Sequence, residues 1–263
     1  MKKRVDLTHE HGIAVVTIDS PPANAMSSEL RRDFDAVLDV LERGSVRSAI
    51  ITGTGRYFQA GGDMNQFLEI NSRDEALRFV QSAQTFMDRI AALPFPTIAA
   101  LNGYALGGGL EIALACDLRI AARTATLGLP EVRYGLLAGA GGTQRLARLV
   151  GPGRAKLMMY TGRHIGAEEA LAIGLVEAVV DAENLLAESL QLAAEIATNS
   201  PVAVRGVKRC VDQGLELPLE QALSLERRCW AELIPYGDYR EGVRAWFEER
   251  QPSYPDVPGV GAD

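Results

Sequence analysis

Three consecutive glycines, Gly107–Gly109, stand directly before a helical pattern in the stretch Asn102–Glu111. Glycine is a poor helix former, so a triplet here indicates an unusual backbone conformation or the close approach of another group. A helix start also presents N–H groups without intrahelical partners, which suit a developing negative charge on oxygen. Glu111 follows Gly108 by about one helical turn and therefore lies over the same side of the helix start. The stretch predicts a backbone donor and a carboxylate in one small volume.

The glycine triplet also has a purely structural interpretation. An acidic residue in the first turn of a helix is favoured by the helix dipole, and glycines can simply permit close packing. A dinucleotide-binding loop is disfavoured, because GxGxxG occurs neither here nor at Gly139–Gly142, and the chain contains no GxxxxGK[ST]. Taken alone, the triplet leaves the functional and structural interpretations open.

A second stretch, Tyr57–Asp63 (YFQAGGD), follows a short buried strand pattern and contains two adjacent glycines. Its backbone amides are therefore candidates to face a ligand. Asp63 is attractive as a catalytic acid, but we expect it to be the N-cap of a helix that begins at Met64, because Asp is a favoured residue at that position.

Two later stretches carry weaker signals. In Gly128–Glu131, proline stiffens the backbone immediately before an acidic residue in an otherwise apolar context. Gly139–Leu146 is a second glycine cluster that enters a helical pattern, and by itself it is equally consistent with a tight turn. Glu131 gains weight only in combination with the other stretches, since an isolated loop glutamate is usually solvated.

The composition is that of a globular chain, and the charge narrows the choice of partners. The 263 residues are 47% hydrophobic, and the net charge of −7 argues against nucleic acid and weakly against an anionic membrane surface. The cysteines and histidines have no metal-binding spacing, so we predict no metal site. No run approaches a membrane span, and the basic start Met1–Arg4 has no apolar stretch behind it, so we expect a cytoplasmic protein.

Apolar periodicity predicts an α/β core followed by helices. The strands are expected at 5–9, 13–19, 48–52, 97–101 and 117–122, and the longer helices at 27–42 and 72–93, with a short one ending at Ala115. From about residue 185 to 250 the pattern is helical only. We therefore expect residues 1–190 to form the core that carries the site, and residues 191–263 to pack on it as part of one integrated unit.

Taken together and in this order, these stretches and several others resemble the enoyl-CoA hydratase/isomerase (crotonase) superfamily. The motifs are FxAGxD at Phe58–Asp63, NGxxxGGGxE at Asn102–Glu111, PE at Pro130–Glu131, GxGGTQRL at Gly139–Leu146, GxxxA at Gly151–Ala155, SPxAxxxxK at Ser200–Lys208 and EGxxAxxExR at Glu241–Arg250. Each motif is weak alone, but the ordered set is specific and covers nearly the whole chain.

The resemblance implies an α/β fold, a crotonase-like spiral of repeated ββα units, with a helical C-terminal region at a subunit interface. It implies a homotrimer or a dimer of trimers, and an acyl-CoA thioester as the substrate, with no separate cofactor. The backbone amides of Gly62 and Gly108 would form an oxyanion hole for the thioester oxygen. Glu111 would act as a base toward water that adds at C3, and Glu131 would protonate C2.

The resemblance also implies which residues contact the acyl-CoA: Phe58, Gln59, Ala60, Gly61, Met64, Gly107, Leu129, Pro130, Leu136 and Gly139. Gln59 stands where a small residue is frequent, Leu129 where a polar residue is common, and Ala138 where proline often precedes the glycine turn. These departures bear on the identity of the substrate more than on the type of reaction. Gly139 lacks the aspartate that some dienoyl-CoA isomerases and dehalogenases carry nearby, which counts against both activities.

The leading hypothesis is enoyl-CoA hydration or its reverse, because adding water requires one group to accept a proton and another to deliver one. A 3,2-enoyl-CoA isomerase, in which Glu131 alone would suffice, is the first alternative. A biosynthetic dehydratase or decarboxylase that acts on a branched or carrier-linked acyl group is another. A non-enzymatic scaffold is disfavoured, since the acidic charge does not suit an RNA partner. The sequence does not predict the length or branching of the acyl chain.

Overall fold

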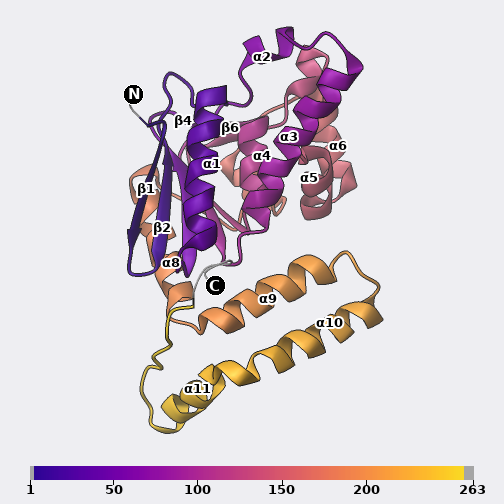
Figure 1. Cartoon of the computed structure of the whole chain (residues 1–263). Helices are drawn as coiled ribbons and strands as arrows, with labels where there is room; N and C mark the ends of the chain where they lie inside the picture. The colour runs from indigo at the N-terminus through magenta and orange to yellow at the C-terminus, as the bar shows by residue number, and fades with distance from the viewer. Residues whose placement is uncertain (1–2, 258–263) are drawn as a thin grey trace.

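The computed structural model describes residues 3–257, which form two sheets with helices around them (Figure 1). The larger sheet is six-stranded, in the order β1 (Val5–Glu10), β2 (Ile13–Ile18), β3 (Ser48–Gly53), β5 (Thr97–Leu101), β7 (Leu118–Ala122) and β10 (Ala178–Val180). Only the β1–β2 hairpin is antiparallel, and the other pairs are parallel. The smaller sheet is four-stranded, in the order β4 (Tyr57–Gln59), β6 (Tyr104–Leu106), β8 (Thr126–Gly128) and β9 (Ile165–Gly166).

The chain winds as the predicted spiral, in which each turn gives one strand to each sheet and then a helix. The successive turns are β3, β4 and the helices α2 (Met64–Leu68) and α3 (Arg73–Ala91); β5, β6 and α4 (Gly108–Ala115); and β7, β8, the 3-10 helix η1 (Glu131–Tyr134) and α5 (Gly142–Val150). Because β4, β6 and β8 are parallel neighbours, their carboxyl ends meet at one edge of the smaller sheet. The segments that follow these strands are therefore brought together.

The predicted helix starts are confirmed by their caps. At the starts of α1 (Ser28–Arg43), α2 and α3, a side-chain oxygen accepts a hydrogen bond from a backbone N–H in the first turn, which satisfies one otherwise unpaired donor. The capping residues are Ser27, Asp63 and Ser72. Asp63 is thus the N-cap of α2, as expected, and its carboxylate is used to hold the backbone.

The core lies between the sheets and their helices. The buried face of α1 carries Leu30, Phe34, Val37, Leu38 and Leu41, at the helical spacing that the sequence shows. Strand β5 is buried along its whole length, as its run of small and branched apolar residues predicts. After β8, the chain continues through α6 (Pro152–Thr161) and α7 (Ala167–Ala172), and then through β10 and the 3-10 helix η2 (Ala182–Asn184).

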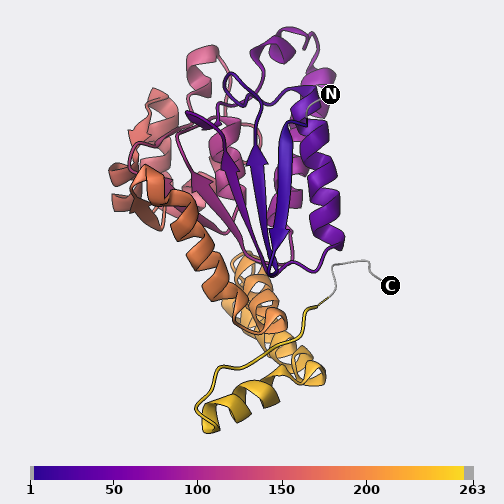
Figure 2. The same ribbon diagram turned by 90° about the vertical axis from the view of Figure 1, so that its left-hand side faces the viewer.

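The C-terminal region is helical from Leu185 onward. It comprises α8 (Leu185–Ala197), α9 (Pro201–Gly214), α10 (Leu219–Glu232), the 3-10 helix η3 (Ile234–Tyr236) and α11 (Asp238–Phe247). Helix α8 packs against β3 and β5, whereas α9, α10 and α11 project from the core as an arm (Figures 1 and 2). The segment after α11 returns to the core, where Arg47 donates hydrogen bonds to Tyr254 O and Asp256.

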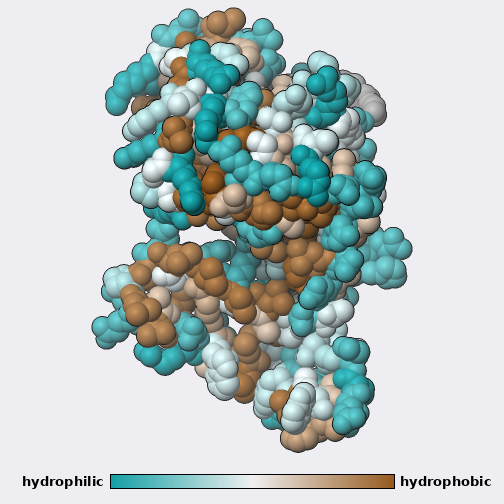
Figure 3. Space-filling view, turned by 180° about the vertical axis from the view of Figure 1, so that it is seen from behind, coloured by the Kyte–Doolittle hydropathy of each residue, from teal (hydrophilic) through white to brown (hydrophobic). Residues whose placement is uncertain are grey.

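Large apolar side chains are exposed along this arm. They include Val207, Val211, Leu215, Leu219, Leu223, Trp230, Val243, Trp246 and Phe247. Figure 3 shows apolar residues gathered on the arm and on the part of the core next to it. An apolar surface of this extent is typical of an interaction surface. Within residues 3–257, no helix has the length and apolar character needed to cross a membrane.

Candidate active site

Glu111 is a buried carboxylate held by two backbone amides. It lies in the first turn of α4 and is 4% exposed. Its Oε1 accepts hydrogen bonds from Ala140 N at 2.7 Å and from Gly142 N at 2.8 Å. The glycine cluster at the start of α5 therefore does more than turn the chain, because it supplies the donors that a buried carboxylate needs. Burial raises the pKa of Glu111, and the two amides together with Arg145 oppose that rise.

Glu131 differs in its surroundings. It opens η1 after Pro130, so it belongs to a short 3-10 helix and is half-buried, where an open loop was expected. Its Oε2 is buried and, within the described part of the chain, has no hydrogen-bond partner. Burial, with a smaller contribution from the charge of Glu111, raises the pKa of Glu131 to about 7. A carboxyl group with this pKa can both give and take a proton near neutral pH.

Two glycines with positive φ shape the backbone between these carboxylates. Gly107 precedes α4 with φ +53°, and a Cβ at this position would lie 3.0 Å from Glu131 Oε1. Gly61 has φ +102°, and a Cβ there would lie 3.2 Å from Leu106 O. A larger residue at either position would be strained by the positive φ and tightly packed against its neighbours.

The loop after β4 touches the start of α4. A Cβ built on Gly108 would lie 3.7 Å from Gly61 Cα and 3.8 Å from Gly62 N. Among the residues that the structure describes, the amides of Gly62 and Gly108 donate to no protein acceptor, whereas Gly107 N donates to Gly128 O. Two neighbouring backbone donors are thus free beside the two glutamates, which is the arrangement that an oxyanion requires.

The residues expected to contact the acyl-CoA have different degrees of exposure. Those that are buried are Phe58, Gln59, Gly61, Gly107, Leu129 and Pro130, those that are half-buried are Ala60 and Gly139, and those that are exposed are Met64 and Leu136. Phe58 belongs to the hydrophobic core, so its side chain anchors the loop that follows β4. Leu129 packs beside Glu111, since a Cβ at Gly142 would meet both Leu129 Cδ1 and Glu111 Oε1 at 3.0 Å.

Sequence reasoning missed the functions of three positions. The amides of Ala140 and Gly142 bind Glu111, and the buried side chain of Gln59 binds the backbone of Gly61. The glycine cluster at 139–142 indicated backbone amides able to face a partner, but nothing in the sequence identified Glu111 as that partner. The only signal for Gln59 was that a long polar residue stood where a small one is frequent.

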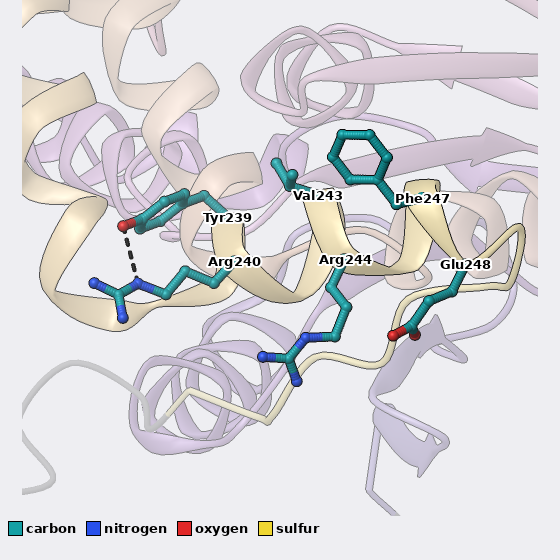
Figure 4. A pocket seen from close by; sticks show the side chains of 6 residues that line it. All are labelled: Tyr239, Arg240, Val243, Arg244, Phe247 and Glu248. Atoms are coloured by element: carbon teal, nitrogen blue, oxygen red, sulfur yellow. Dashed lines mark hydrogen bonds between the residues drawn. The ribbon is translucent and has the colours of Figure 1, made fainter.

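Two hollows lie elsewhere, in the C-terminal region. One, of about 480 Å³, lies along α11 and is lined by Tyr239, Arg240, Val243, Arg244, Phe247 and Glu248 (Figure 4). The other, of about 530 Å³, lies between α9 and the end of α10. Neither hollow is lined by Glu111, Glu131, Gly62 or Gly108, so both are separate from the candidate site.

Comparison with known proteins identifies the family to which the chain is similar. The family model described as enoyl-CoA hydratase/isomerase matches residues 8–257. The short-chain-enoyl-CoA hydratase of Clostridium acetobutylicum is 40% identical over 250 residues, covering 94% of this chain and 95% of that protein. The crotonyl-CoA hydratase of Syntrophomonas wolfei is 40% identical over 255 residues, covering 96% and 98%.

The fold of the chain is also similar to that of solved structures. The crystal structure of enoyl-CoA hydratase from Bacillus anthracis has a TM-score of 0.90 and 39% sequence identity, covering 95% of this chain and 98% of that one. The similarity therefore includes both sheets and the C-terminal helices. On its sequence and its fold, this chain belongs to the enoyl-CoA hydratase/isomerase (crotonase) family.

Proposed function

We propose that the protein is an enoyl-CoA hydratase, which reversibly adds water across the 2,3 double bond of an enoyl-CoA thioester. The observation that carries this proposal is the pair of carboxylates in unlike surroundings beside two free backbone amides. Relatives named as enoyl-CoA hydratases support it at about 40% identity over their full length. CoA enters as part of the substrate.

The amides of Gly62 and Gly108 activate the substrate. Both N–H groups donate to the thioester oxygen, and their hydrogen bonds strengthen as negative charge develops there. Electron density is drawn from C3, which becomes open to attack by water. Fixed donors of this kind are worth about 3–4 kcal/mol each in the transition state. No reorganisation is needed, because helix α4 and the loop after β4 already hold the two amides.

The two glutamates divide the proton transfers. Glu111 uses Oε1 to accept two amide hydrogen bonds, so its Oε2 is the oxygen assigned to the attacking water. As the water oxygen bonds to C3, a water proton passes to Glu111. Glu131 gives its proton to C2, and its pKa of about 7 leaves a protonated fraction at neutral pH. Dehydration follows the same path in reverse.

One observation favours a second function, 3,2-enoyl-CoA isomerisation. Glu131 has a buried oxygen without a partner and a pKa suited to both proton removal and delivery, so it alone is able to move a proton between carbons. In that reaction Glu111 would be dispensable. The same pair of glutamates would also serve a dehydratase on a branched or carrier-linked acyl group.

The deciding experiment uses crotonyl-CoA in water enriched in heavy oxygen. Hydration bleaches the conjugated-enoyl absorbance and places solvent oxygen in the product, whereas isomerisation of a 3-enoyl-CoA incorporates none. Glu111→Gln and Glu131→Gln should each lower hydration by about 10²–10⁴-fold, as expected on losing a general acid or base. Glu188→Gln, an exposed position on α8, is the matched control and should keep full activity. Full turnover in both active-site variants would refute the proposal.

We propose further that the active assembly is a homotrimer or a dimer of trimers. The support comes from the arm of α9, α10 and α11, which exposes a row of large apolar side chains (Figure 3). A second copy of the chain is the occupant that the family resemblance indicates. Sedimentation velocity should give a trimer or hexamer, and a monomer at micromolar concentration would refute this assembly.

A further inference from the structure

Gln59 is a fully buried polar residue whose side chain closes on the backbone two residues ahead. It ends strand β4 and is 0% exposed. Its Oε1 accepts a hydrogen bond from Gly61 N at 2.7 Å, and its Nε2 donates to Gly61 O at 2.8 Å. Both functions of the carboxamide are thus used on one residue, which itself lies directly before Gly62.

The Gly61–Gly62 peptide unit determines where the Gly62 N–H points. Gly61 C=O and Gly62 N–H belong to the same planar trans unit, so the N–H is directed opposite to the C=O. Gly61 O is held by two donors, Gln59 Nε2 and Met26 N at 2.9 Å. Fixing the direction of that oxygen therefore fixes the direction of the Gly62 N–H. Since Gly61 is a glycine at φ +102°, its own sterics restrain this peptide weakly.

Gln59 also contacts the segment that carries the other donor. A Cβ on Gly109 would lie 2.0 Å from Gln59 O and 2.7 Å from Gln59 Oε1. The carboxamide is therefore packed between Gly61 and the first turn of α4, one residue after Gly108. A shift of the carboxamide would change the distance between the free N–H groups of Gly62 and Gly108.

We propose that Gln59 is a positioning residue for the oxyanion hole, and this rests on the proposed acyl-CoA function. Its Nε2 aims the Gly62 N–H at the thioester oxygen. Its Oε1 occupies the Gly61 N–H, so that Gly62 alone donates from this loop. Gln59 does not touch the reacting atoms, and its effect on catalysis passes through the peptide between Gly61 and Gly62.

The test combines kinetics with the thioester carbonyl stretch of bound butyryl-CoA, which is saturated and cannot be hydrated. Gln59→Met keeps the length of the side chain and removes both hydrogen bonds. We expect kcat for crotonyl-CoA to fall about 10–100-fold, less than the loss of a whole oxyanion donor, with KM changed less than about threefold. The downshift of the carbonyl stretch on binding should shrink in parallel. Gln59→Asn keeps a carboxamide and should fall between Gln59→Met and the unaltered protein.

A matched control separates positioning from stability. Ser48→Ala removes another fully buried side-chain hydrogen bond, from Ser48 Oγ to Ala193 O, in the larger sheet. It should lower Tm but leave kcat and the carbonyl stretch unchanged. Unchanged kcat in Gln59→Met would overturn the proposal, and so would a loss of kcat with an unaltered carbonyl stretch. If Gln59→Met does not fold, the same two measurements on Gln59→Asn decide the matter.

Failure of the proposed function gives a different result. An unaltered protein that shifts the butyryl-CoA carbonyl stretch without hydrating crotonyl-CoA would refute hydration, yet the spectroscopic comparison would still test Gln59. An unaltered protein that neither binds butyryl-CoA nor turns over crotonyl-CoA would refute both.

Discussion

Glu111 and Glu131 are electrostatically coupled: the charge of Glu111 adds to the larger effect of burial in raising the pKa of Glu131 to about 7. The two residues come from successive turns of the spiral, one after β6 and the other after β8. These strands are parallel neighbours in register, with Leu106 opposite Gly128. The register of the smaller sheet therefore sets the distance over which the two carboxyl groups influence each other.

The raised pKa of Glu131 predicts that kcat/KM falls on the alkaline side of the pH profile. In the proposed hydration Glu131 must carry the proton that it delivers to C2, and it loses that proton as pH rises through about 7. Hydration should therefore decline above that pH. Dehydration should show the same profile, because the overall equilibrium neither takes up nor releases a proton. Initial rates in both directions from about pH 5 to 9 provide the check, and a flat profile on the alkaline side would contradict the assignment.

The raised pKa of Glu131 also has a consequence for stability. The folded protein holds this proton more tightly than the unfolded chain, so Glu131 lowers stability progressively as pH rises from the ordinary carboxyl value of 4.5 to about 7. Glu131→Gln lacks the ionisation and should escape that loss. Its Tm should exceed that of the unaltered protein clearly at about pH 8 and little near pH 4. Thermal melts at both pH values test this, and an equal difference at both would count against it.

Gly109→Ala should be strongly destabilising. The added Cβ would lie 2.0 Å from the backbone oxygen of Gln59, and no side-chain rotation can relieve that contact. We expect a loss of roughly 3 kcal/mol in the free energy of unfolding, at the upper end for overpacking. Gly153→Ala in α6 is the matched control, since nothing lies within 4 Å of its built Cβ. That change should alter the free energy of unfolding by less than about 0.5 kcal/mol, because Gly153 is the second residue of α6 and gains only part of the propensity difference of a helix interior. Denaturant titrations of both variants compare them directly.

Lys208 fastens α9 to the core. Its ammonium pairs with Asp117, whose other carboxylate oxygen accepts from Thr97 N at 2.7 Å and Thr97 Oγ1 at 2.8 Å. Lys208→Met leaves that charge unpaired at the base of the arm, and should lower stability by roughly 3 kcal/mol. Adding Asp117→Asn should recover part of the loss, because the amide needs no counter-ion. A double-mutant cycle measures the coupling, and strictly additive losses would show that the pair contributes nothing.

Sequence predicted five of the six strands of the larger sheet and the long helices, but it missed β10 and gave no range for any strand of the smaller sheet. The strand pattern of Thr97–Leu101 and the cap at Ser72 are local features, so composition and spacing sufficed. Strands β4, β6 and β8 contain three residues each, which is too short for alternation to show. Their places follow from the winding of the spiral, which no local pattern records.

In the candidate site, too, contacts between residues close in sequence could be predicted and contacts between distant residues could not. Glu111 and the glycine triplet stand close in sequence, so their proximity followed from the geometry of one helix turn. The bonds from Ala140 and Gly142 to Glu111 join residues far apart in the chain, and only the packing of α5 against α4 creates them. Gln59 departs from the family pattern in the sequence, but its hydrogen bonds to Gly61 depend on the rotamer of a buried side chain.

The donors of the proposed oxyanion hole are main-chain groups, and this governs what mutagenesis can detect. A systematic alanine scan leaves the N–H of Gly62 and of Gly108 in place, so it cannot delete either donor. If Gln59 positions the Gly62 N–H as proposed, the scan would instead register this fully buried residue as a functional position. When the activating groups are backbone amides, substitutions reveal them through the side chains that hold the backbone. Here that side chain is Gln59, which binds Gly61 next to the Gly62 N–H.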